Sequence, residues 1–140
     1  MKYTLYLILA FAYVLTACAQ NKTVKNITVE NLQEKMLQDS SIVILDVRNP
    51  QELTGPLGSI KGAINIPVQE LGSRINELEV YKDKEIAVIC RTGRRSLTAT
   101  EILDNSGFDA MNILGGMVEY RNFEKEINST KMENPTNQLK

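Results

Sequence analysis

Residues 86–96 read IAVICRTGRRS, and the organisation of the chain can be worked out from this segment. Residues 86–89 are an uninterrupted apolar run of the length expected for a strand buried on both faces. Cys90 ends this run, and Ser96, a favourable helix N-cap, precedes an apolar face with helical spacing at residues 99–103. The pattern predicts a strand, a tight loop and a helix N-terminus around one thiol.

This arrangement suits a nucleophilic cysteine that faces an anion. Backbone N–H groups of a short loop and of a helix N-terminus form an anion cradle. Arg91, Arg94 and Arg95 add positive charge, which favours the thiolate and lowers the pKa of Cys90. Gly93 allows a positive φ in the loop. The alternative is a buried core cysteine before an arginine-rich surface turn, but three arginines and a glycine within five residues favour a functional site.

Composition excludes several other classes of function. The chain has 140 residues, enough for one domain, with 43% hydrophobic and 24% charged residues and a net charge of −1, so nucleic acid is not an expected partner. Histidine is absent, which excludes Cys-His and Ser-His-Asp catalysis and any His-ligated metal. Cys18 and Cys90 are too few for a Cys-only zinc site, so we expect neither a metal nor another cofactor.

The N-terminal residues have the features of an export signal. Residues 5–15 form an apolar run, and the uncharged stretch around it, 3–19, is shorter than the about 20 residues that a membrane span needs. Residues 15–18, LTAC, resemble the bacterial lipobox. We therefore expect a lipoprotein signal peptide over 1–17, lipidation of Cys18 and a polar tether over 18–25. A plain secretory signal, or a retained signal-anchor, is the alternative. The expected location is the bacterial cell envelope, facing the periplasm, with the lipid as the only membrane attachment.

The remaining pattern alternates short apolar strands with amphipathic helices. Besides 86–89, strands are expected at 42–45, 64–66 and 111–113. Thr28 is the expected N-cap of a first helix, and further helices are expected around 71–78, after Ser96 and over 117–127. This order predicts an α/β domain with a mostly parallel sheet, in which ligands bind beyond the carboxyl ends of strands, where Cys90 lies. The polar segment 128–140 predicts a disordered tail.

Four motifs in order resemble the rhodanese family of sulfurtransferases. They are DVR at 46–48, GSIKGAINIP at 58–67, CRTGRRS at 90–96 and LGGM at 114–117. The resemblance covers residues 26–127, most of the chain after the signal peptide. It implies a rhodanese-like fold, with a central, mostly parallel five-stranded sheet flanked by helices on both faces.

The resemblance also implies a chemical role for the loop. Cys90 would accept a sulfane sulfur as a persulfide and pass it to a thiophilic acceptor. The substrate-binding residues would be those whose amides and side chains surround the sulfur: Arg91, Thr92, Gly93, Arg94, Arg95 and Ser96. Among them, Arg95 would help to fix both the loop and the anion. Thiosulfate is the generic donor, and a thiol, cyanide or a protein would be the acceptor.

Other motif residues would play supporting roles. Asp46 and Arg48 would border or support the loop, although a surface ion pair explains them equally well. Gly115 and Gly116 would allow close backbone packing beneath the site. Ser59 departs from the pattern, because many family members have histidine at this position, and this puts local packing and substrate preference in question.

Three rival functions remain open. A related cysteine-dependent phosphatase carries one more residue between the cysteine and the arginine than the four that separate Cys90 from Arg95 here. A lipid-anchored scaffold with the same fold would use no chemistry, although inactive members typically lose the cysteine. A thiol–disulfide oxidoreductase would lack a resolving cysteine once Cys18 is lipidated, unless a partner supplied one.

Overall fold

Five short strands form one parallel sheet in the computed structural model of the protein, which describes residues 23–38 and 41–133. The strands lie in the order β1-β5-β4-β2-β3, and every neighbouring pair is parallel. In chain order they are β1 (Asn26–Ile27), β2 (Val43–Asp46), β3 (Ile64–Asn65), β4 (Glu85–Ile89) and β5 (Asp109–Ile113). The predicted fold class is confirmed.

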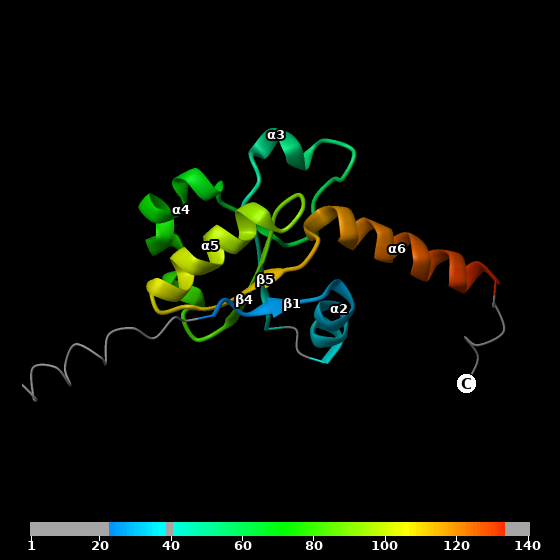
Figure 1. Ribbon diagram of the computed structural model, residues 1–140, viewed down its shortest axis with the longest axis horizontal. Helices are drawn as coiled ribbons and strands as arrows, with labels where there is room; N and C mark the ends of the chain where they lie inside the picture. Colours follow the sequence, from blue (N-terminus) through cyan, green and yellow to red (C-terminus); the bar gives the residue numbers. More distant parts are fainter. Residues whose placement is uncertain (1–22, 39–40, 134–140) are drawn as a thin grey trace, which may run out of the picture.

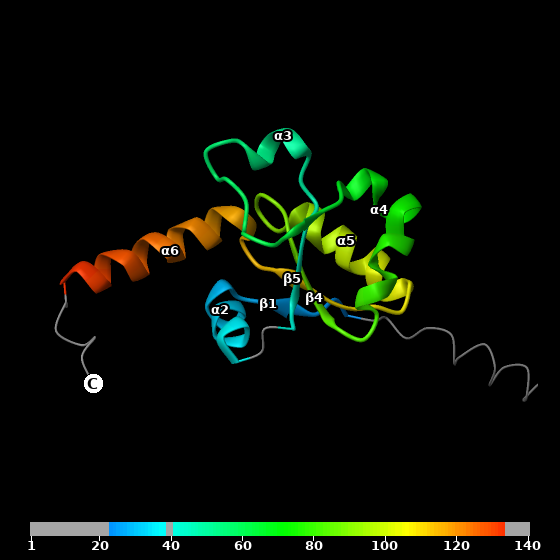
Figure 2. The ribbon, with the colours of Figure 1, turned by 180° about the vertical axis from the view of Figure 1, so that it is seen from behind.

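Helices cover both faces of this sheet (Figures 1 and 2). They are α2 (Val29–Gln38), α3 (Pro50–Leu53), α4 (Val68–Arg74), the 3-10 helix η1 (Ile75–Tyr81), α5 (Arg94–Asn105) and α6 (Gly116–Glu133). One core cluster contains side chains of α4, η1 and α5, and the other contains side chains of α2 and α6. The sheet therefore separates two cores, and α3 lies beyond its carboxyl edge near the start of α5 (Figure 1).

The central strand β4 supplies both cores. Ile86 and Val88 face the cluster with α5, whereas Ala87 and Ile89 face the cluster with α6, and all four side chains have 0% exposure. Alternation of faces along a strand places an uninterrupted apolar run between two helical layers. The run at 86–89 is therefore the centre of the fold, and the chain leaves the sheet directly at Cys90.

Strand β1 was not expected from the sequence. It has only two residues, of which Asn26 is polar, and it pairs in register with the end of β5, Asn26 with Asn112 and Ile27 with Ile113. So short a segment has no periodicity, and its pairing depends on the tertiary structure. The helix after it begins as expected, because the Thr28 hydroxyl accepts a hydrogen bond from the Asn31 N–H at 3.3 Å.

The prediction of a disordered tail from residue 128 is wrong for its first part, because α6 continues to Glu133. From residue 128 the sequence becomes polar, and this change marks the loss of the apolar face of α6 rather than the end of the helix. Ser129 and Thr130 are exposed, and both hydroxyls donate to the carbonyl of Glu126. The expected signal peptide, Cys18 and residues 134–140 lie outside the described residues. Within 23–38 and 41–133 no helix is long and apolar enough to cross a membrane.

Candidate active site

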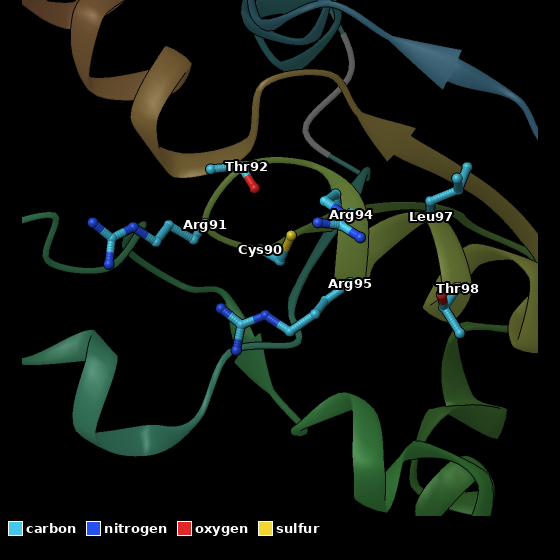
Figure 3. A pocket seen from close by; sticks show the side chains of 7 residues that line it. All are labelled: Cys90, Arg91, Thr92, Arg94, Arg95, Leu97 and Thr98. Atoms are coloured by element: carbon cyan, nitrogen blue, oxygen red, sulfur yellow. The ribbon is translucent and has the colours of Figure 1, made fainter.

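The loop between β4 and α5 surrounds the cysteine at the carboxyl edge of the sheet. The Cys90 side chain is 1% exposed, and it lies at the wall of an open pocket of about 620 Å³. The other lining residues all come from this loop and the start of α5: Arg91, Thr92, Arg94, Arg95, Leu97 and Thr98 (Figure 3). The strand, loop and helix expected around one thiol are therefore present.

The helix begins earlier than the sequence suggested. Its first residue is Arg94, its N-cap is Gly93, and Ser96 is the third helical residue rather than the cap. Gly93 has φ +93°, a left-handed conformation that turns the chain directly into the helix, whereas Ser96 is completely buried. The consequence is that the Ser96 hydroxyl is free to face the sulfur instead of capping the helix.

Hydrogen-bond donors surround the sulfur. The Gly93 N–H lies 3.2 Å from Cys90 Sγ, and the Ser96 hydroxyl lies 3.4 Å from it. Burial raises the pKa of the Cys90 thiol, but the hydrogen bonds from the Ser96 hydroxyl and from the amides of Ser96, Thr92 and Gly93 outweigh it, and the pKa falls below its ordinary value. A lowered pKa agrees with the sequence prediction, but hydrogen bonds to the sulfur are the main cause of the lowering.

The three arginines of the loop differ in their surroundings. Arg91 and Arg94 are exposed, whereas Arg95 forms a bidentate ion pair with Glu52 of α3, at 2.7 and 2.8 Å. Figure 3 shows Arg95 reaching toward α3 and Arg91 pointing away from Cys90. The Arg95 hydrogen bond lowers the pKa of Glu52 to about 2. Arg95 thus fixes α5 to α3, and its fork is already occupied by a carboxylate of this chain.

The Asp46–Arg48 pair is buried, so the interpretation as a surface ion pair is wrong. Each side chain is only 1% exposed, with Arg48 Nη2 at 2.6 Å and Nε at 2.9 Å from the carboxylate of Asp46. Arg48 also donates to the carbonyls of Gly58 at 2.7 Å and Glu52 at 3.4 Å. It therefore holds the segment that carries α3 beside the cysteine loop, without lining the pocket at Cys90.

The start of α6 holds the loop from its other side. The N–H of Met117 donates to the carbonyl of Cys90 at 2.8 Å, and the N–H of Val118 donates to the carbonyl of Arg91 at 3.1 Å. Gly116 has φ +59°, and a Cβ on it would lie 2.5 Å from the Cys90 carbonyl oxygen. The expected close packing at this glycine is confirmed.

Comparison with known proteins agrees with this geometry. The family model described as "Rhodanese-like domain" matches residues 28–123. The chain belongs to the rhodanese-like family. Two relatives of this rhodanese-like domain are named for sulfur transfer. It is 33% identical to the putative sulfurtransferase YtwF of Bacillus subtilis (75% of this chain, 98% of the relative). It is 28% identical to a sulfurtransferase of Allochromatium vinosum, over 69% of this chain and 88% of the relative.

Solved structures show the same fold. A rhodanese-related protein from Thermoplasma volcanium has a TM-score of 0.64 and 36% identity, over 71% of this chain and 92% of that one. The rhodanese-like domain of this chain thus has the architecture of its family.

Two features of this rhodanese-like site had weak signals in the sequence. Glu52 stands three residues after Asn49, and the two form a capping box at α3, but nothing local indicates that Glu52 also pairs with Arg95. Asn112 lies within the apolar strand β5, and its contact with Ser96 depends on the packing of α5 against that strand. Ser59 is exposed and lies outside the pocket at Cys90, and its carbonyl accepts a hydrogen bond from Arg121 at 2.9 Å.

We expect Gly116→Ala to destabilise this rhodanese-like domain by about 2–3 kcal/mol, because the new methyl meets the Cys90 carbonyl and the backbone is left-handed. Chemical denaturation of the purified variant measures the loss. Gly62→Ala is the matched control, since Gly62 also has positive φ (+82°), but among residues 23–38 and 41–133 no atom beyond its chain neighbours lies within 4 Å of the place that the new methyl would occupy. An equal loss in both variants would show that close packing against Cys90 contributes nothing.

Proposed function

We propose that the protein is a sulfurtransferase that carries a sulfane sulfur as a persulfide on Cys90, with thiosulfate as donor. The acceptor is a small thiol, cyanide in the laboratory, or a protein thiol. The observation that carries this proposal is the buried Cys90 sulfur, with the Gly93 amide and the Ser96 hydroxyl directed at it, at the wall of an open pocket. Sulfurtransferases among the relatives support the same reaction class.

The proposed reaction has two displacement steps. In the first, the Cys90 thiolate attacks the outer sulfur of thiosulfate, the S–S bond breaks, and sulfite leaves with the bonding electron pair. In the second, the acceptor attacks the outer sulfur of the persulfide, and the electron pair of the S–S bond returns to Cys90 as thiolate. The thiol proton leaves before the first step, and the hydrogen bonds to the sulfur ease this ionisation by lowering the pKa of Cys90.

The residues of the loop would share the binding of the anion. Amides of Thr92, Gly93 and Ser96 already stabilise negative charge on the sulfur, and they would stabilise it as it moves outward during transfer. Arg91 and Arg94 are exposed at the same loop and would attract a small dianion such as thiosulfate. Arg95 would fix the loop through Glu52 and would also help to hold the anion, because its guanidinium interacts with Cys90 as well as with Glu52.

The length of the loop bears on the phosphatase alternative. A related cysteine-dependent phosphatase carries one more residue between the cysteine and the arginine than the four that separate Cys90 from Arg95, and the shorter loop leaves less room for a phosphate. Transfer from thiosulfate to cyanide, measured as thiocyanate, tests the proposal against hydrolysis of an aryl phosphate. We expect thiocyanate and no phosphate release. Phosphate release without thiocyanate would overturn the proposal, and neither product would favour the scaffold.

We also propose that residues 1–17 are a lipoprotein signal peptide and that Cys18, followed by a tether over 18–25, anchors the protein in the bacterial cell envelope, facing the periplasm. The lipobox-like sequence at 15–18 supports the anchor.

Labelling of growing cells with a fatty-acid probe tests the anchor. We expect the native chain to be labelled and to fractionate with membranes, and Cys18→Ser to lose the label. Cys90→Ser is the control, because it removes the other cysteine and should leave labelling unchanged. Label that persists in Cys18→Ser, or no label in the native chain, would contradict lipidation at this residue.

A further inference from the structure

The Ser96 hydroxyl has a single hydrogen and two acceptors within reach. Its oxygen lies 2.7 Å from Asn112 Oδ1 and 3.4 Å from Cys90 Sγ. Ser96 has 0% exposure and Asn112 has 3%, so water does not take the place of either acceptor. A hydroxyl donates one hydrogen bond at a time, and the two acceptors therefore compete for it.

Hydrogen bonds from Asn112 to Asn26, and from Asn26 to the Val24 carbonyl, fix the orientation of the Asn112 side-chain amide. The Nδ2 group of Asn112 donates to Oδ1 of Asn26 at 2.9 Å, and Nδ2 of Asn26 donates to the carbonyl of Val24 at 3.2 Å. A carbonyl only accepts, so Asn26 must present its NH₂ to Val24 and its oxygen to Asn112. Asn112 must then present its own oxygen to Ser96.

We propose that Asn112 is a positioning residue that competes with Cys90 for the hydrogen of the Ser96 hydroxyl, and that Asn26 holds Asn112 in the competing orientation. When Cys90 is a neutral thiol, Ser96 donates to Asn112 and can accept from the S–H group. When Cys90 is a thiolate or the leaving group of the second step, Ser96 turns its hydrogen to the sulfur and leaves the buried Asn112 oxygen without a donor. The strand β1 thus acts on the nucleophile through two amide side chains.

The inference builds on the proposed nucleophilic role of Cys90, and it concerns one contribution among several that act on the thiol. The charged groups around the loop are the exposed Arg91 and Arg94, the Arg95–Glu52 pair from α5 and α3, and the Asp46–Arg48 pair at the end of β2. Of these, Arg95 also interacts directly with Cys90. From α6 the contact with Cys90 is a backbone N–H on its carbonyl. Substitution of Asn112 or Asn26 by an apolar residue changes none of these charges.

Removal of the competing acceptor should therefore make Cys90 easier to ionise. In Asn112→Val, the Ser96 hydrogen has only the sulfur to bond, and in Asn26→Ala the Asn112 amide is free to turn its NH₂ toward Ser96. We expect the pH midpoint of Cys90 alkylation to fall by about half to one unit in Asn112→Val, and by less in Asn26→Ala. Asn26 does not contact Cys90, so a fall in its variant requires the chain of amides.

The experiment uses the full-length chain and the rate of alkylation by iodoacetamide as a function of pH, read by mass spectrometry on the peptide that contains Cys90. The alkylation rate does not depend on turnover. The pH midpoint can therefore stay unchanged in the variants of a protein that does transfer sulfur, and it can shift in the variants of a protein that does not. Ser96→Ala provides the matched background, because without the hydroxyl neither Asn112→Val nor Asn26→Ala should move the midpoint. An unchanged or raised midpoint in Asn26→Ala, or an equal fall when Ser96 is absent, would overturn the proposal.

Discussion

Cys90→Ser is expected to lower sulfur transfer by at least about a thousandfold, the largest effect of any single substitution in the protein. Ionised sulfur is the nucleophile of the proposed reaction, and a serine hydroxyl without an adjacent base is almost wholly protonated at neutral pH. The donors that favour the Cys90 thiolate, such as the Gly93 amide at 3.2 Å, do not lower the pKa of an alcohol far enough to replace it. Serine also cannot form a persulfide.

Thiocyanate formation by purified protein measures this loss. Cys18→Ser is the control, since Cys18 lies before the domain and its replacement should leave turnover of the purified protein unchanged. The unfolding midpoint of Cys90→Ser should stay close to that of the native protein, because the substitution is small. Turnover retained by Cys90→Ser would mean that another group carries the sulfur.

Arg48→Met is expected to produce the largest loss of stability, about 3–5 kcal/mol in the free energy of unfolding. The carboxylate of Asp46 is 1% exposed, and the substitution removes the guanidinium that pairs with it. Of the donors that residue 48 supplies, only its backbone N–H, at 3.0 Å, then remains. The carbonyl of Gly58 loses its bond from the guanidinium as well. The segment that carries α3 should then detach from the cysteine loop, so activity should fall with stability.

Two further variants test whether the loss of stability comes from the unpaired, buried carboxylate of Asp46. Arg74→Met removes an arginine that pairs with Glu70 and Glu77 at the surface, and its denaturation midpoint should change little. Asp46→Asn combined with Arg48→Met removes the unpaired charge, and it should recover part of the loss. A stability of Arg48→Met close to that of Arg74→Met would contradict the structural role of the buried pair.

The part of the fold that was predictable is the part that depends on local patterns. The apolar run before Cys90 and the spacing after it define a buried strand and a helix, and Thr28 marks the start of α2. The two-residue strand β1 could not be found in this way, because its pairing with β5 comes from packing. The end of α6 was missed for the opposite reason, since an exposed helix end needs no apolar face.

In the candidate site, too, only the features that depend on local sequence could be predicted. Positions in the loop could be assigned from the motif, and the structure places them around the sulfur. The direction in which each side chain points could not, because it depends on groups distant in sequence. Arg95 turns to Glu52, which is 43 positions away, and Ser96 turns to Asn112 because Gly93 begins the helix before it.

The most direct test of the central claim is the mass of the intact protein after incubation with thiosulfate, without an acceptor, followed by gel filtration. We expect the addition of one sulfur atom on the peptide that contains Cys90, its absence in Cys90→Ser, and its loss when a thiol or cyanide is added. A native protein that keeps an unmodified Cys90 under these conditions, or that gains the sulfur equally in Cys90→Ser, would contradict the account.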